Sequence, residues 1–227
     1  MIVALIDYKA GNLTSVRKAL TSLGAEIRTP DAAADLVGVD AVIVPGVGNF
    51  EATAALDQAW HDAIHARLDA GIPLLGICLG QQWLFEGSDE APSVRGLGVL
   101  PGRCVRLETG DAALKVPHVG WNALHRTGVA SRLLDGVDDD AQAYFTHSYV
   151  APDGEATVAT TEHGRPFASV VEQGLVFGAQ FHPEKSGNTG LRMLRNFLDV
   201  AESVGTARRA VRDGRVGDAS LPTEGSR

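Results

Sequence analysis

Short, wholly apolar runs alternate with segments of helical period along the first part of the chain. The apolar runs cover residues 1–7, 41–44 and 73–77. Over residues 12–23 and 51–70, apolar side chains recur every three or four positions, which is the period of a helix with one buried face. Apolar strands that alternate with helices are typical of a mostly parallel sheet with helices on both faces. We therefore expect an α/β fold.

The second half of the chain changes to short segments rich in β-forming residues and separated by Gly, Pro and Asp. The segments cover residues 141–149, 156–161, 168–171 and 175–181. We interpret them as antiparallel strands that extend the first sheet, not as a second domain. A closing helix is predicted over 191–204, and residues 205–227 have almost no apolar period. We expect one domain over residues 1–204 and a frayed C-terminal tail over 205–227.

The composition is that of a packed globular protein with an excess of acid. Of 227 residues, 44% are hydrophobic and 21% are charged, and the net charge is −8. This balance does not favour binding to nucleic acid or to an anionic membrane. No apolar run approaches the ~20 residues that a membrane-spanning helix needs. Residues 1–7 are too short and too acidic for a signal peptide, so we expect a cytoplasmic protein.

Cys78 lies in the stretch Gly-Ile-Cys-Leu-Gly at residues 76–80, between an apolar run and a helical segment. A nucleophile flanked by small residues at a strand-to-helix turn is the pattern of a nucleophile elbow. The helix N-terminus would favour the thiolate, and the N–H of Leu79 would face a developing oxyanion. A lone cysteine is more often a small buried hydrophobic residue, but the pentapeptide favours the nucleophile. Cys104 has no such context, and we expect it to be structural.

Of the seven histidines, His182 is the best placed to serve such a nucleophile. It follows the apolar run 175–181, and sheet enzymes place their chemistry at strand ends. Pro183 stiffens the backbone after it, and Glu184 lies two residues further on, where an extended chain puts both side chains on one face. Glu184 could then hold the imidazole in the useful tautomer. A surface His-Pro-Glu turn is the alternative, and the elbow cysteine makes it the weaker one.

Three other patterns could suggest a ligand site, and each has a simpler explanation. His61 and His65 have the spacing of two helical zinc ligands, but no third ligand follows, so we expect a solvated helix edge. Gly96 and Gly98 lack the third glycine of a dinucleotide loop. The acids at 138–140 point in different directions, which favours a solvated loop over a cation site. We expect neither a metal nor a cofactor.

The stretches around Cys78 and His182 resemble a known family. Residues 76–82 read Gly-Ile-Cys-Leu-Gly-Gln-Gln and residues 181–186 read Phe-His-Pro-Glu-Lys-Ser, which resemble the class I (triad) glutamine amidotransferases, enzymes of flavodoxin-like fold. Within that class the chain is similar to the glutaminase subunits of imidazole glycerol phosphate synthases. The stretches that carry this closer resemblance are Asp-Tyr-Lys-Ala-Gly-Asn-Leu at 7–13, Pro-Gly-Val-Gly-Asn-Phe at 45–50, Val-Pro-His-Val-Gly-Trp-Asn at 116–122 and His-Ser-Tyr at 147–149.

The resemblance implies a role for each of these residues in a site that takes glutamine as its substrate. Cys78 would be the nucleophile, His182 the acid and base, and Glu184 the carboxylate that orients the imidazole. The backbone near Val47 and the N–H of Leu79 would stabilise the oxyanion. The residues implied to hold glutamine are Gly48, Gln82, His147, Ser148 and Tyr149.

The stretch around Val47 also suggests a means of control. Glycines on both sides of Val47 make rotation of its peptide cheap. A glutaminase that worked without an acceptor for its ammonia would waste glutamine, so we expect the isolated chain to hold this N–H away from the pocket. Two positions depart from the family pattern: Lys9 stands where glycine is common, and Thr146 replaces a usual valine.

A partner subunit is implied as well. Asn12, His118, Trp121 and Lys185 match positions that the family turns towards a (β/α)₈-barrel cyclase, with which it forms a heterodimer. That cyclase would use the ammonia to form imidazole glycerol phosphate and AICAR in histidine biosynthesis.

Two other functions stay open at this point. One is a glutaminase subunit of anthranilate, formylglycinamidine or pyridoxal phosphate synthesis, which would share the catalytic residues. The other is a flavodoxin-like protein in which Cys78 is a redox sensor. A sensor would need neither Gln82 nor the His182-to-Glu184 segment, so these residues favour a glutaminase.

Overall fold

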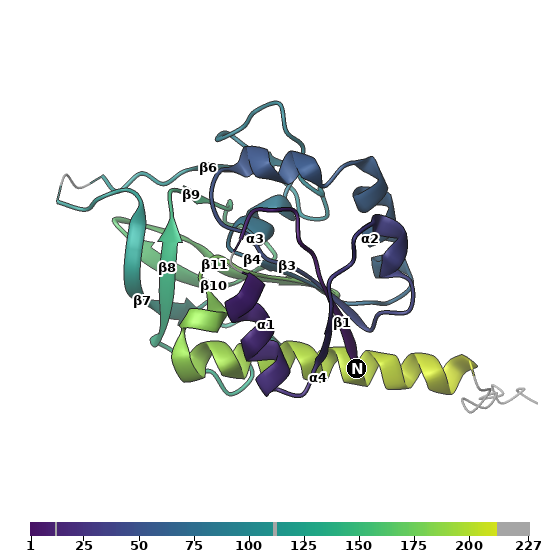
Figure 1. Cartoon of the computed structure of the whole chain (residues 1–227). Helices are drawn as coiled ribbons and strands as arrows, with labels where there is room; N and C mark the ends of the chain where they lie inside the picture. The colour runs from purple at the N-terminus through teal and green to yellow at the C-terminus, as the bar shows by residue number, and fades with distance from the viewer. Residues whose placement is uncertain (12, 111–112, 213–227) are drawn as a thin grey trace, which may run out of the picture.

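The computed structural model describes residues 1–11, 13–110 and 113–212, and a large sheet runs through its centre (Figure 1). Its strands are β1 (Ile2–Leu5), β2 (Glu26–Arg28), β3 (Ala41–Val44), β4 (Leu74–Ile77), β7 (His118–Arg126), β8 (Ala141–His147), β10 (Thr157–His163), β11 (Arg165–Gln173) and β12 (Val176–Ala179). Within the described residues their order is β2-β1-β3-β4-β12-β11-β10-β7-β8.

The sheet is parallel on one side of β12 and antiparallel on the other. Strands β2, β1, β3, β4 and β12 pair in parallel, whereas β11, β10, β7 and β8 continue the sheet with antiparallel pairs. The predicted parallel sheet with an antiparallel extension is therefore confirmed. The prediction for 175–181 needs one correction, because β12 is antiparallel only to β11. A tight turn at Gly174 (φ 57°) brings it back beside β4, in the same direction.

Helices cover both faces of the sheet (Figure 1). The helices are α1 (Leu13–Ser22), α2 (Gln58–Asp69), α3 (Leu79–Trp83) and α4 (Gly187–Arg212), with short 3-10 helices η1 (Ala33–Leu36), η2 (Phe50–Ala55) and η3 (Pro183–Lys185). Successive side chains of β1 point to opposite faces. Val3 and Leu5 pack in the cluster that includes α1 and α4, whereas Ala4 and Ile6 pack in the cluster that includes α2 and α3. Each face therefore has its own core.

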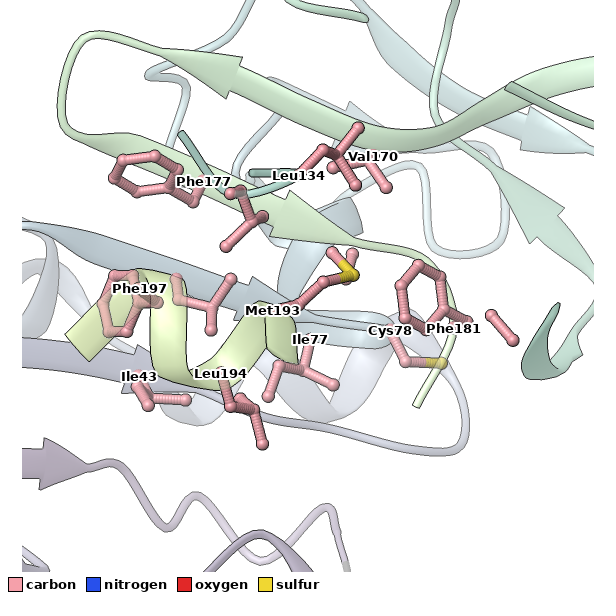
Figure 2. Packing of buried hydrophobic residues seen from close by; sticks show 14 of the residues in the cluster. Ile43, Ile77, Cys78, Leu134, Val170, Phe177, Phe181, Met193, Leu194 and Phe197 are labelled. Atoms are coloured by element: carbon pink, nitrogen blue, oxygen red, sulfur yellow. The ribbon is translucent and has the colours of Figure 1, made fainter. Parts of the chain in front are cut away.

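One of these cores contains residues of α4 together with Ile77 and Cys78 (Figure 2). Met193, Leu194 and Phe197 of α4 are buried against the sheet, beside Ile77 at the end of β4. Burying an apolar side chain of this size contributes about 1.5–3 kcal/mol. Helix α4 therefore holds in place the strand end from which Cys78 follows.

The single helix predicted over 51–70 is in fact two helices, η2 and α2. Asp57 separates them, because its carboxylate accepts hydrogen bonds from the N–H groups of Ala59 at 3.0 Å and Trp60 at 3.3 Å and so caps α2. Leu56, at the break, is still buried. The apolar period therefore continues across the break, which explains why the pattern did not reveal it.

Some strands were not predicted. A small sheet is formed by β5 (Gly87–Ser88), β6 (Arg103–Arg106) and β9 (Tyr149–Val150), in that order. Strand β7 lies in the region predicted to be rich in short strands, but its bounds were not predicted, because the start of its pattern is the reverse of an ordinary amphipathic strand. It buries the polar His118 and exposes the apolar Val119 and Trp121, which are 58% and 57% exposed.

Helix α4 is longer than the predicted 191–204 at both ends. It begins at Gly187 and continues through Arg212, so the predicted domain boundary after residue 204 falls within a helix. The rest of the predicted tail, residues 213–227, lies outside the described part of the chain. In that described part, no helix has both the length and the apolar character needed to cross a bilayer.

Candidate active site

Cys78 stands at the sharp turn between β4 and α3, with φ 54° and ψ −108°. A positive φ is strained for a residue with a side chain, and it persists only where the surrounding structure enforces it. The flanking glycines make the turn possible. A Cβ on Gly80 would collide with the carbonyl oxygen of Val44, and one on Gly76 would lie 2.5 Å from the carbonyl oxygen of Gly80. The backbone therefore has the geometry of a nucleophile elbow.

His182 and Glu184 form a buried pair just after β12. Nδ1 of His182 lies 2.9 Å from Oε1 of Glu184, and their side chains are only 2% and 3% exposed. The backbone around them is tied down, because the Ser186 hydroxyl donates to the His182 carbonyl oxygen at 2.7 Å. With Nδ1 donating to the carboxylate, Nε2 of His182 is the nitrogen that remains for chemistry.

The electrostatics of the site favour a charged His182. Burial alone would lower its pKa, but hydrogen bonding and charge from Cys78 and Glu184 together raise the pKa of His182 to about 9. Its Nε2 is buried and makes no hydrogen bond of normal geometry. The influence of Cys78 on this pKa indicates that its sulfur lies near the ring, although the two groups are outside normal hydrogen-bonding geometry. At neutral pH an imidazolium therefore lies beside the Cys78 sulfur.

The sulfur of Cys78 has two further polar neighbours, and neither interaction was predicted. It donates to the backbone carbonyl oxygen of Thr146 at 3.8 Å, and it accepts from Nε2 of Gln180, also at 3.8 Å. Oε1 of Gln180 in turn accepts from Nε2 of Gln82 at 3.1 Å. Gln180 is fully buried and precedes Phe181 and the His-Pro-Glu segment, but a glutamine at the end of an apolar run has no distinctive sequence signal.

A cavity of about 200 Å³ opens in front of Cys78. Its lining residues are Gly48, Cys78, Leu79, Gln82, Glu90, Pro117, Thr146, His147, Ser148 and Tyr149. The structure therefore brings together every residue that the sequence implied for holding glutamine. A larger cavity of about 620 Å³ lies along α4, but Cys78 does not line it, whereas Cys78 lines the smaller one.

Glu90 is a cavity residue that sequence reasoning missed. It follows the two-residue strand β5, and its carboxylate accepts a hydrogen bond from the N–H of Phe50 at 2.8 Å. This bond fixes a negative charge at the cavity wall. No motif marked Glu90 in the sequence, because its place in the site depends on the fold around η2.

The oxyanion donors are both engaged elsewhere. The N–H of Val47 donates to the carbonyl oxygen of Ala10 at 3.0 Å, away from the cavity. The N–H of Leu79 donates to the carbonyl oxygen of Gly46 at 3.4 Å. Since Gly46 O and Val47 N belong to one peptide, a single rotation of that peptide would release both donors. In this structure the Val47 N–H is thus bonded to Ala10, and its expected control of the isolated chain stays a prediction.

The residues implied for a partner interface differ in exposure. Trp121 is 57% exposed and its ring lies edge-on to Tyr144, over which the Lys185 ammonium also lies at 5.8 Å from the ring centroid. His118, in contrast, is buried, so it does not itself form a surface. Asn12 lies outside the described residues.

His118 supports the cavity wall through a chain of hydrogen bonds. The carbonyl oxygen of Tyr149 can only accept, so Nδ1 of His147, 3.0 Å away, donates to it. Nε2 of His147 then accepts from Nδ1 of His118 at 3.1 Å, and Nε2 of His118 accepts from Asn122 at 3.2 Å. Burial lowers the pKa of His118 to about 4 and that of His147 to about 3. Both imidazoles are therefore neutral and fixed in one tautomer.

The expectation for the histidine pair on α2 is wrong in part. His61 is buried and packs edge-on against Trp83 at 5.2 Å, and burial lowers its pKa. It is therefore not at a solvated helix edge, whereas His65 is only partly buried and lies 3.3 Å from the carbonyl oxygen of Leu97. The sequence pattern misled because the face of α2 that carries His61 packs against α3.

Other sequence features have structural explanations. Burial raises the pKa of the Cys104 thiol, which donates to the carbonyl oxygen of Gln82 at 3.6 Å. Lys9 has φ 65°, a conformation that favours glycine. In the acidic run, Asp139 accepts from the backbone N–H of Arg126 at 2.8 Å.

Comparison with known proteins gives a consistent family. The sequence model of the family "Glutamine amidotransferase class-I" matches residues 4–201. The imidazole glycerol phosphate synthase subunit HisH of Xylella fastidiosa (strain Temecula1) is 50% identical over 199 residues, which cover 87% of this chain and 97% of that protein. Subunit HisH of Desulfitobacterium hafniense (strain Y51) is 44% identical over 200 residues, which cover 86% of this chain and 93% of the relative.

Solved structures support the fold. A crystal structure of a glutamine amidotransferase superimposes with a TM-score of 0.69 at 24% sequence identity, covering 89% of this chain and all of that one. A structure of PurLQS from Thermotoga maritima gives a TM-score of 0.68 at 19% identity, covering 87% and 97%. At these identities the likeness shows the shared fold and leaves the chemistry to the site itself.

Proposed function

Because the chain belongs to the class I glutamine amidotransferases, and within them to the HisH subunits of imidazole glycerol phosphate synthase, we propose that it hydrolyses glutamine at Cys78 and supplies the ammonia to a partner subunit. One observation supports the catalytic assignment above the others. A buried imidazole paired with a carboxylate at 2.9 Å acts on an elbow cysteine that opens into a small polar cavity. A nucleophile, a proton donor and an orienting carboxylate are the groups that amide hydrolysis needs.

The first step is attack of the Cys78 thiolate on the side-chain amide carbon of glutamine. The carbonyl electron pair moves onto oxygen, where the N–H groups of Val47 and Leu79, once freed, each stabilise the oxyanion by about 3 kcal/mol. His182 gives its proton to the amide nitrogen, and the C–N bond breaks to release ammonia.

A glutamyl thioester on Cys78 then remains. His182, now neutral, removes a proton from water, and the hydroxide adds to the thioester carbon. When the C–S bond breaks, glutamate leaves, and the thiolate and imidazolium are restored. Glu184 keeps the imidazole in the same orientation through both halves of the reaction.

The cavity wall suits the polar end of glutamine. Glu90 carries a fixed negative charge for the α-ammonium group, and its backbone anchor at Phe50 N keeps it in place. His147, which burial keeps neutral, lines the cavity wall together with Ser148 and Tyr149. This wall is held by the hydrogen-bond chain through His118, so the pocket is largely preformed.

The partner is a (β/α)₈-barrel cyclase subunit, which joins the ammonia to its own substrate. Free ammonia in bulk water becomes ammonium and loses its nucleophilicity, so the two active sites need a closed connection. Trp121, Tyr144 and Lys185 form an exposed group of the kind that anchors protein interfaces. Strand β8 joins this group to the cavity, because it carries Tyr144 and ends at His147.

A glutamine-like diazo-ketone tests the catalytic assignment directly. Such an electrophile needs a glutamine pocket as well as a thiolate, so it should label Cys78 rapidly and leave Cys104 unlabelled. Excess glutamine should slow the labelling, and mass spectrometry of peptides would identify the site. Labelling that glutamine does not slow, or that peroxide alone reproduces at Cys78, would refute a glutaminase and support a redox sensor.

A further inference from the structure

Gln180 is fully buried beside the Cys78 sulfur and does not line the cavity, and its amide is held in a defined orientation. The backbone carbonyl oxygen of Tyr149 can only accept a hydrogen bond. The amide of Gln82 approaches it at 2.9 Å, so that atom of Gln82 must be Nε2. The same NH₂ group lies 3.1 Å from the Gln180 amide.

This second contact orients Gln180. Since Nε2 of Gln82 is a donor, the Gln180 atom that faces it must be the oxygen, Oε1. The NH₂ group of Gln180 is then left facing the Cys78 sulfur at 3.8 Å, within the range of an N–H···S hydrogen bond. The chain of donors and acceptors therefore leaves the Gln180 amide only one orientation, in which it presents a donor to the sulfur.

The opposite contact of the sulfur explains why such a donor matters. In the thiol form, S–H can donate to the carbonyl oxygen of Thr146 at 3.8 Å. In the thiolate form that bond is lost, and the negative sulfur faces the negative end of a carbonyl dipole. An N–H group that donates to the sulfur favours the thiolate, because a hydrogen bond to a charged acceptor is stronger than one to its neutral form. Gln180 thus offsets a contact that favours the thiol.

We propose that Gln180 is a positioning residue for the nucleophile, and that its amide, held by Gln82, donates to the Cys78 sulfur and favours the reactive thiolate. The inference rests on the proposed function only for the use of the thiolate, since the hydrogen bonds exist whatever the substrate. Gln180 does not touch the cavity, so it acts on glutamine only through Cys78 and Gln82.

The test is the pH dependence of alkylation of Cys78 by iodoacetamide, which follows the thiolate and needs no glutamine turnover. Gln180→Met keeps an unbranched side chain and removes the donor. The pH midpoint of Cys78 alkylation should rise by about one pH unit relative to the wild type. At a pH well below that midpoint, alkylation should therefore be about tenfold slower. Gln180→Glu replaces the donor with a negative charge and should raise the midpoint further. The other titratable groups around the sulfur are unchanged in every variant; they are Tyr8, Glu90, His147, His182 and Glu184.

Gln81→Met is the matched control. Gln81 is also a fully buried glutamine, but its amide donates to the carbonyl oxygen of Ala168 at 3.3 Å and does not contact the sulfur. A general loosening of the core would move the midpoint in both variants, whereas the proposed hydrogen bond moves it only in Gln180→Met. Peptide mapping separates Cys78 from Cys104, and far-UV circular dichroism checks that each variant folds.

An unchanged alkylation midpoint in folded Gln180→Met and Gln180→Glu would overturn the proposal. So would equal shifts in Gln180→Met and Gln81→Met. Failure of the proposed function would look different. The pH midpoint of Cys78 alkylation would still depend on Gln180, but the wild-type protein would hydrolyse no glutamine. If Gln180→Glu alone fails to fold, the comparison of the two methionine variants still decides the question.

Discussion

At the scale of single residues, the site depends on which atoms carry protons. The buried Glu184 carboxylate binds Nδ1 of His182, so the proton that matters is on Nε2, towards Cys78. Cys104 is as buried as Cys78 but stands in a strand without an elbow or a histidine. These differences lead to two predictions about individual side chains.

The first prediction concerns the catalytic residues. Cys78→Ala and Cys78→Ser should abolish glutamine hydrolysis, because neither side chain offers a thiolate. Glu184→Gln should cost less than His182→Asn, because orienting a base generally matters less than being one. Steady-state assay of glutamate release measures each variant. Cys104→Ser is the control and should keep most of the activity; loss of activity in that variant with a normal fold would contradict the assignment.

The second prediction concerns pH. His182 must be protonated to deliver a proton to the leaving nitrogen, and its pKa is raised to about 9. The value of kcat/KM should therefore hold up to pH 8 or so and fall as pH rises through about 9. Glu184→Gln removes a charge that raises the pKa of His182, so its alkaline limb should move to lower pH. If kcat/KM of the wild type instead fell near pH 6.5, the ordinary histidine pKa, the result would contradict a His182 pKa raised by Cys78 and Glu184.

At the scale of elements, the stretch between β3 and η2 holds both N–H groups proposed for the oxyanion hole. In this structure one peptide engages both, because its oxygen accepts from Leu79 N and its nitrogen donates to Ala10 O. Gly46 and Gly48 flank Val47 and leave the rotation free of side-chain clashes within the stretch; Gly48 already has φ 97°. To move the peptide from 1:99 to 99:1 in favour of the inward orientation, the partner and its ligand must bind that orientation ~10⁴-fold better than the other.

The third prediction follows from that stretch. Glutamine turnover should be slow for the chain alone, faster with the cyclase, and fastest with the cyclase and its ligand. Val47→Pro removes the N–H and should suppress turnover in the activated complex, while Cys78 still reacts with iodoacetamide. Val47→Ala keeps the N–H and is the matched control. Equal rates in the three conditions would rule out the switch and leave a permanently formed oxyanion hole.

At the scale of the whole molecule, the parallel and antiparallel parts of the sheet divide the site between them. Cys78 comes from the end of β4, and His182 follows β12, so these neighbouring parallel strands supply the reacting groups. His147, from the antiparallel extension, lines the cavity, and His118 of the neighbouring strand supports it through a hydrogen bond. That extension also exposes Trp121, which belongs to the proposed partner interface.

The fourth prediction tests the division of labour between two chains. A complex that contains the Cys78→Ala subunit should still form the cyclase product when ammonium salts are added at raised pH. The acceptor chemistry lies in the other chain and needs only NH₃, whose share rises with pH. The same complex with glutamine should make no product. If ammonium cannot replace glutamine, the proposed transfer between subunits is wrong.

The chain pattern alone determined much of the architecture and the reacting groups. Short, fully apolar runs at 41–44 and 73–77 are typical of strands buried on both faces, and they form β3 and β4. The Gly-Ile-Cys-Leu-Gly stretch at 76–80 allows one local turn, because its glycines permit a close approach that other residues prevent. His182 and Glu184 lie two residues apart, so their pairing is also local. Such features are encoded over a few neighbouring residues, which is why sequence reasoning found them.

Only the tertiary structure decided which distant groups share the site. Gln180 meets Cys78 across 102 positions, and Glu90 reaches the cavity through Phe50, 40 positions away. His61 is buried because α3 packs on it, and the Val47 N–H is turned away because Ala10 O happens to lie beside it. These contacts depend on how the elements pack, and a residue's own neighbours in the sequence contain no information about them. Periodicity reports which face is buried, but the partner of a buried polar atom is set by the whole fold.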